Sequence, residues 1–113
     1  MVLKNGVTIM STAEKIVFLD QNGRDAFSHG RYEDALYYLG MAADRARLAG
    51  TPLQEADIRN TIGLVFRDLG NPAQAEIHFK LALSLIEKKA GDDAPLYSVV
   101  TANLRDLRQA AGM

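Results

Sequence analysis

Five glycines divide this chain at nearly equal intervals. Gly30, Gly50, Gly70, Gly91 and Gly112 lie 20, 20, 21 and 21 residues apart. Glycine often ends helices because it can adopt the left-handed backbone conformation without a Cβ clash. Each interval holds one helix of roughly five turns followed by a tight turn, so successive helices must run antiparallel. The spacing therefore predicts an all-α fold of about five antiparallel helices.

Between these glycines, apolar and small residues recur at steps of three and four, the spacing of one helix face. The predicted helices cover residues 12–29, 31–49, 52–69, 72–89 and 95–111. Ser11 and Glu14 have the spacing of a capping box at the start of the first helix. The same reasoning predicts side-chain caps for later helices at Thr51, Asn71 and Asp92-Asp93.

Length and charge narrow the remaining choices. With 113 residues, the chain is expected to form one domain over residues 11–113, preceded by a flexible segment over residues 1–10. Met1 and Met10 both remain possible native starts. Basic and acidic residues number 13 and 14 and are mixed along the sequence, so nothing favours nucleic acid or an anionic membrane as a partner. The chain lacks cysteine and any long apolar run, and we expect a cytoplasmic protein.

The chain also resembles itself after a shift of 40 residues. Small residues coincide at matching helical positions, four times over. A shared period of this length indicates helix–turn–helix units stacked in an array. The coinciding pairs are Gly23 with Gly63, Gly30 with Gly70, Ala35 with Ala75, and Ala42 with Ala82.

This repeat resembles the tetratricopeptide repeat family. The segment Gly30-Arg31-Tyr32-Glu33-Asp34-Ala35-Leu36 is similar to the family's Gly-x-Tyr-x-x-Ala-Leu turn. Two full repeats cover residues 12–90, and residues 94–113 resemble a third first helix, either a cap or a truncated repeat. The period is 40–42 residues instead of about 34, and Pro72 replaces the turn tyrosine of the second repeat. The longer period resembles the extended-repeat branch found in kinesin light chains and some bacterial regulators.

The resemblance implies a right-handed solenoid of two and a half repeats, with a concave face lined by the first helix of each repeat. It implies a non-catalytic protein–protein interaction module or scaffold that holds a peptide or helix of a partner protein there. Carried over to this sequence, the partner-binding positions are Asp20, Arg24, Phe27, Asp57, Asn60, Leu64 and Arg67. Asn60 would bind a peptide backbone and the arginines its carboxylates. A solvated polar face with local ion pairs is the alternative.

The last helix has an uncertain register on this face. A period of 42 places Val99, Ala102, Asp106 and Gln109 there, while a shift of the register would bring Asn103 onto the face instead.

Catalytic and ligand-binding motifs are not found in the sequence. The two histidines, His29 and His78, share no plausible helix face with a carboxylate, so no metal site is expected. The expectation is a protein without enzymatic activity, cofactor or small-molecule substrate. Two other roles remain open: self-assembly as a homodimer through the last helix or the concave face, and service as a regulatory subunit of a signalling or enzyme complex.

Overall fold

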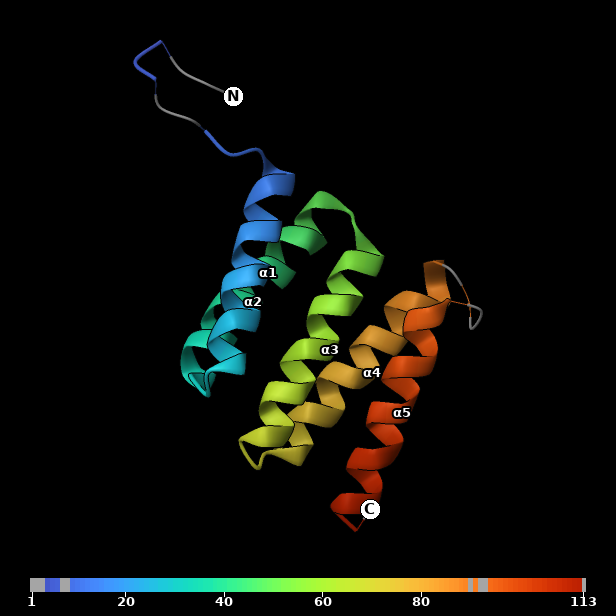
Figure 1. Cartoon of the computed structure of the whole chain (residues 1–113). Helices are drawn as coiled ribbons and strands as arrows, with labels where there is room; N and C mark the ends of the chain where they lie inside the picture. Colours follow the sequence, from blue (N-terminus) through green and yellow to red (C-terminus); the bar gives the residue numbers. More distant parts are fainter. Residues whose placement is uncertain (1–3, 7–8, 90, 92–93, 113) are drawn as a thin grey trace.

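The computed structural model describes residues 4–6, 9–89, 91 and 94–112, and all regular structure in these residues is helical. Each helix runs antiparallel to the one before it, and α1, α3 and α5 form one layer with α2 and α4 behind (Figure 1). The predicted all-α fold of antiparallel helices is therefore confirmed. The helices are α1 (Thr12–Ser28), α2 (Tyr32–Ala49), α3 (Pro52–Asp68), α4 (Pro72–Lys89) and α5 (Pro95–Ala110).

The turns between helices use the glycines that the spacing predicted. Gly30, Gly50 and Gly70 have φ values of 74°, 71° and 76°, in the left-handed region that only glycine enters without strain. The residue after each glycine then donates its backbone N–H to a carbonyl five residues earlier, which completes a Schellman motif. These bonds are Arg31 N to Ala26 O, Thr51 N to Ala46 O and Asn71 N to Phe66 O, at 2.8, 3.0 and 2.9 Å.

Two of the predicted helix caps are confirmed. Ser11 Oγ accepts the Glu14 N–H at 3.1 Å, and Glu14 Oε1 accepts the Ser11 N–H at 3.2 Å, which is a complete capping box. Asn71 Oδ1 accepts the Gln74 N–H at 3.2 Å at the start of α4.

The cap predicted at Thr51 is wrong. Its side chain accepts no backbone N–H of α3. Its Oγ1 instead lies 3.1 Å from Ala46 O and 2.9 Å from Gln54 Oε1, two acceptors that share its single hydroxyl proton. The cap predicted at Asp92-Asp93 lies outside the described residues, as does part of the segment 1–10. Helix ends differ from the predicted ones by one residue at His29, Arg31, Leu69 and Ala111, which flank their helices.

Two apolar clusters fill the space between the layers. The first joins α1, α2 and α3 through residues such as Ile16, Leu39 and Ile58. The second joins α3, α4 and α5 through residues such as Phe79, Ile86 and Val100. Because α3 contributes to both clusters, the central hairpin is packed on both sides.

The outward face of α5 is polar. On α3, the positions that pack against α4 are Ala56, Gly63 and Phe66, and a shift of 42 residues places Ser98, Arg105 and Arg108 at the matching positions of α5. All three of these side chains are exposed. A polar outer face is typical of the helix that closes a repeat array.

Candidate functional site

The face shared by α1 and α3 is held together by a charged cluster. Arg24 on α1 lies between two carboxylates: its Nε is 2.9 Å from Asp20 Oδ1, and its Nη2 is 2.9 Å from Asp57 Oδ2 on α3. The second of these ion pairs joins helices that are neighbours in space but distant in sequence. Three of the predicted site residues are therefore brought into direct contact.

An amide pair continues this face from α3 to α5. Asn103 Nδ2 donates to Asn60 Oδ1 at 2.9 Å, and Asn60 is only 6% exposed. Among the described residues, His78 Nδ1 is the one fully enclosed side-chain nitrogen or oxygen without a hydrogen-bond partner. The Asn60 Nδ2 atom, which has no hydrogen-bond partner among these residues, therefore reaches solvent. We call Asp20, Arg24, Asp57, Asn60 and Asn103 together the first-helix polar face.

The first-helix polar face carries two carboxylates, Asp20 and Asp57, for one guanidinium, Arg24, so its ionisable side chains are negative on balance. Burial raises the pKa of the Asp20 carboxyl, and the nearby Arg24 guanidinium only partly opposes this effect. Two carboxylates surround one guanidinium, and half of the Asp57 side chain remains exposed. A carboxylate of a partner would have to compete with Asp57 for Arg24, so the arrangement is better suited to a cation than to the acid that the sequence suggested.

The other predicted site residues lie apart from this cluster. Phe27 is half-buried and packs against Tyr32, with ring centroids 6.0 Å apart. Leu64 packs on the apolar cluster of α3, α4 and α5. Arg67 pairs with Asp68 at 3.0 Å and borders a hollow of about 170 Å³ near the end of α5. No contact joins Arg67 to Arg24, so the two arginines do not form one anion site.

Asn103 is the residue that sequence reasoning placed with least certainty. It lies 43 residues after Asn60, whereas the interval between the glycines of the last repeats predicted 42. The buried Ile58 and Val100, 42 residues apart, keep the predicted register, so the amide contact joins neighbouring positions of the two helices. The sequence signal for this contact was the Asn103 amide at the alternative register, because buried amides on facing helices commonly hydrogen-bond each other.

The two histidines occupy structural positions. His29 is the C-cap residue of α1, and its Nδ1 lies 2.8 Å from the carbonyl oxygen of Asp25. His78 stacks on Phe66 with ring centroids 5.5 Å apart. Burial lowers the pKa of His78 to about 4, and the positive charge of Arg59 adds to this shift. Within the described residues, no three histidine or acidic side chains are grouped so that they could hold a metal ion.

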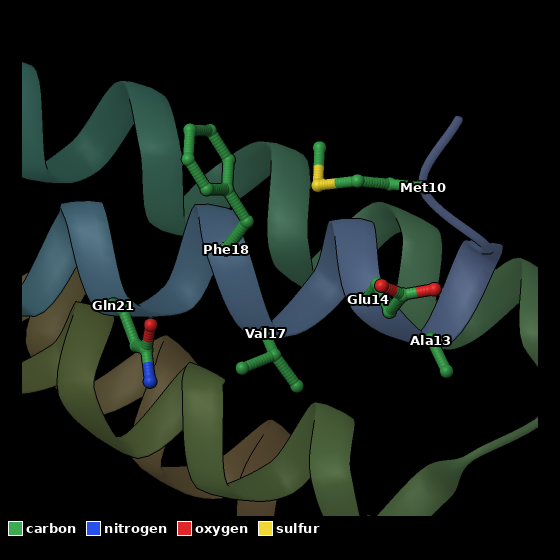
Figure 2. A pocket seen from close by; sticks show the side chains of 6 residues that line it. All are labelled: Met10, Ala13, Glu14, Val17, Phe18 and Gln21. Atoms are coloured by element: carbon green, nitrogen blue, oxygen red, sulfur yellow. The ribbon is translucent and has the colours of Figure 1, made fainter. Parts of the chain in front are cut away.

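Hollows that the sequence did not predict lie at the other end of the molecule. One of about 390 Å³ follows the outer side of α1, and Figure 2 shows its lining side chains. A second, of about 200 Å³, lies between α1 and α2. Met10 and Phe18 border both. The available signal was the apolar Phe18, one repeat period before Ile58, at a position that no helix of the described residues covers.

In the described part of the chain, no helix is both long and apolar enough to cross a membrane.

Comparison with known proteins identifies the fold. A crystal structure of BtubC (BKLC) from P. vanneervenii matches this chain with a TM-score of 0.81 at 17% sequence identity. The match covers 95% of this chain and 43% of BtubC, so the chain spans less than half the length of that protein. No protein-family model matches the chain, and no curated protein matches it in sequence. The chain therefore has a helical fold similar to that of BtubC, while the narrower tetratricopeptide assignment remains a prediction.

Proposed function

We propose that this protein is a non-catalytic interaction module that holds a segment of a partner protein against the layer formed by α1, α3 and α5. The observation that carries this proposal is the first-helix polar face, which continues across three helices through the Arg24–Asp57 and Asn103–Asn60 contacts. Polar groups arranged over three parallel helices offer recognition points along an extended or helical segment.

The chemistry of this face suggests what the segment carries. Within the described part of the chain, Asn60 Nδ2 and Asn103 Oδ1 make no hydrogen bond, which leaves one donor and one acceptor for a backbone amide. The exposed carboxylate of Asp57 favours a lysine or arginine of the partner. We therefore propose a segment with a basic side chain about one helix spacing, or roughly 10 Å, from its amide contact at α5.

This proposal includes the role of a regulatory subunit in a larger complex, since such a subunit would use the same face. It also includes a cytoplasmic location. Homodimerisation remains a separate candidate, but the exposed Arg105 and Arg108 on the outer face of α5 disfavour that end of the array as an apolar interface.

Affinity capture from the source cells with paired variants tests the proposal. Asp57→Lys should abolish recovery of partners, because it reverses the charge at the centre of the face. Asp44→Lys makes the same change on α2, where the carboxylate has only a 3.8 Å contact with Arg47, and should leave recovery unchanged. Circular dichroism checks that both variants fold. Equal recovery with wild type and Asp57→Lys would exclude the α1–α3–α5 layer as the binding face.

A further inference from the structure

The N-terminal side of α1 carries an apolar residue where later repeats bury one. Phe18, Ile58 and Val100 occupy the same repeat position, 40 and 42 residues apart. Ile58 and Val100 are 1% and 0% exposed, since each faces the helix that precedes its own, while Phe18 is 50% exposed. The α1 helix thus presents the surface that α3 and α5 use to pack against a preceding helix.

Hollows surround this position. Met10 and Phe18 border hollows of about 390 and 200 Å³, and the smaller one also has Leu19 and Met41 in its lining. In Figure 2, the Phe18 side chain extends from α1, and the side chain of Met10, which precedes this helix, lies on the same side of it. A third hollow, of about 340 Å³, continues along α2 beside Leu48, which is 79% exposed.

Two cations border this apolar surface. Lys15 and Arg45 both line the hollow of about 200 Å³, and neither forms an ion pair within the described residues. Glu14 is the acidic residue that lines the neighbouring hollow, but its carboxylate is already bound to the Ser11 N–H in the capping box. We call Met10, Lys15, Phe18, Met41, Arg45 and Leu48 the N-terminal edge.

The rest of α1 limits how far an occupant can extend. The positions that hold the buried Ile62 and Val65 on α3 hold Asn22 and Asp25 on α1. A helix lying along all of α1 would remove Asn22 and the Asp25–Arg31 ion pair, 3.6 Å apart, from water, at a cost. The apolar part of the edge is therefore confined to the first three turns of α1 and the facing part of α2.

The polar outer face of α5 also decides against a second copy stacked head to tail. In such an array, this face would cover the N-terminal edge. Its Arg105 and Arg108 side chains pair with Asp106 and Glu76, so it offers ion-paired side chains where Phe18 needs an apolar stripe. The edge therefore suits a chain of different composition.

We propose that the N-terminal edge binds an amphipathic helix of a partner protein, with an apolar stripe flanked by acidic residues. The stripe covers Phe18 and Met41 as α2 covers Ile58, and the acidic residues pair with Lys15 and Arg45. This surface is separate from the first-helix polar face, and the proposal does not depend on the function proposed for that face.

Methyl NMR with two synthetic peptides tests this directly. Each is a stapled amphipathic helix of about 11 residues, roughly 16 Å long, with a leucine stripe. One carries glutamate at the flanking positions and the other lysine. Selectively labelled methionine methyls report at the edge itself, because Met10 and Met41 line the hollow. The glutamate peptide should shift both methyl signals in a saturable way, and the lysine peptide should not.

Charge reversal provides the specificity test. Lys15→Glu with Arg45→Glu should weaken binding of the glutamate peptide by about tenfold or more and favour the lysine peptide. Lys88→Glu with Arg105→Glu is the matched control, which makes the same charge change elsewhere and should leave both affinities unchanged.

Three results would overturn the proposal. The first is equal binding of the two peptides, and the second is retention of the original preference after charge reversal at Lys15 and Arg45. The third is a shift of the Met10 and Met41 signals with protein concentration alone, which would assign the edge to a second copy.

Discussion

Gly63 lies directly against the ring of Phe79 where α3 crosses α4. A Cβ atom built on Gly63 would lie 2.5 Å from Phe79 Cε1 and 2.7 Å from Cδ1, closer than real Cβ atoms approach other atoms. Gly23 and Leu39 repeat this relationship between α1 and α2, where the Cβ would lie 2.5 Å from Leu39 Cγ. The missing side chain thus lets a large residue of the second helix pack onto the backbone of the first in each hairpin.

Adding one methyl group at this crossing should be destabilising. Gly63→Ala forces Phe79 to move within a closely packed core, and we expect a loss of about 1–3 kcal/mol in the free energy of unfolding. Urea denaturation followed by circular dichroism measures this change.

Gly40 provides the matched control, because it also lies inside a helix but its Cβ would meet no atom within 4 Å. Gly40→Ala should therefore stabilise the protein by about 0.5–1 kcal/mol through helix propensity alone. A stabilising effect of Gly63→Ala would show that the α3–α4 crossing has room for a side chain.

The same substitution at equivalent repeat positions should have unequal effects. Ile58→Ala removes a buried side chain and should cost about 2–5 kcal/mol. Phe18→Ala removes a larger side chain that is 50% exposed, and we expect a cost of only about 1 kcal/mol. Equal losses in urea denaturation would mean that Phe18 is covered in solution.

The Asn60–Asn103 hydrogen bond should stabilise the packing of α5 on α3. Asn103→Ala leaves the Oδ1 atom of the buried Asn60 without its donor, which should cost about 1–3 kcal/mol. A double-mutant cycle with Asn60→Ala isolates the interaction itself. Additive effects of the two substitutions would show that the amides do not interact in solution.

Acid should destabilise the protein through His78. Its pKa is lowered to about 4 in the folded state from an ordinary value of 6.5, so the unfolded chain binds this proton first as pH falls. The contribution of the neutral His78 side chain to the free energy of unfolding is therefore fully present above pH 6.5. This contribution is lost as the pH falls from 6.5 to about 4, and it changes no further below that pH. Because the side chain is only half-buried, the loss is on the order of 1 kcal/mol.

Melting temperatures of the wild type and His78→Gln, compared across this pH range, measure the contribution. The carboxyl groups titrate in both proteins, so the difference between the two curves reports His78 alone. A constant difference from pH 7 to pH 4 would contradict the lowered pKa.

The Glu76 carboxyl, which joins α4 to Arg108 on α5, provides a second titration that can be measured. The hydrogen bond from Arg108 lowers the pKa of the Glu76 carboxyl, and Lys80 contributes a further hydrogen bond in the same direction. Arg108→Gln should therefore raise the pKa of Glu76 toward its ordinary value, as measured by carbon-13 NMR of the carboxyl group. Arg105→Gln should leave this pKa unchanged, because Arg105 pairs with Asp106 instead.

The helical layout could be predicted from sequence because its determinants are local. A glycine with positive φ and a capping side chain act within a few residues of their own position, and the helix period links each apolar residue to its neighbours on one face. Thr51 shows where such reasoning fails, since its hydroxyl has acceptors on both sides and bonds Ala46 and Gln54 in place of the backbone of α3.

The candidate site was predictable in position but less so in its pairing. The resemblance to the tetratricopeptide repeat, together with the period, placed Asp20, Arg24, Asp57 and Asn60 on one layer of helices. Their partners depend on how far each helix slides along its neighbour, and a difference of one residue decides whether Ala102 or Asn103 meets Asn60.

By itself, the sequence determined the number of helices, their antiparallel order and the small residues at their crossings, because these follow from spacing along the chain. Only the tertiary structure decided that Arg24 is held between two carboxylates, that Asn60 meets Asn103, and that Phe18 lies uncovered beside Lys15 and Arg45. The physical reason is that ion pairs, side-chain hydrogen bonds and exposed edges depend on distances between helices far apart in sequence, which are fixed when the side chains of both apolar clusters pack together.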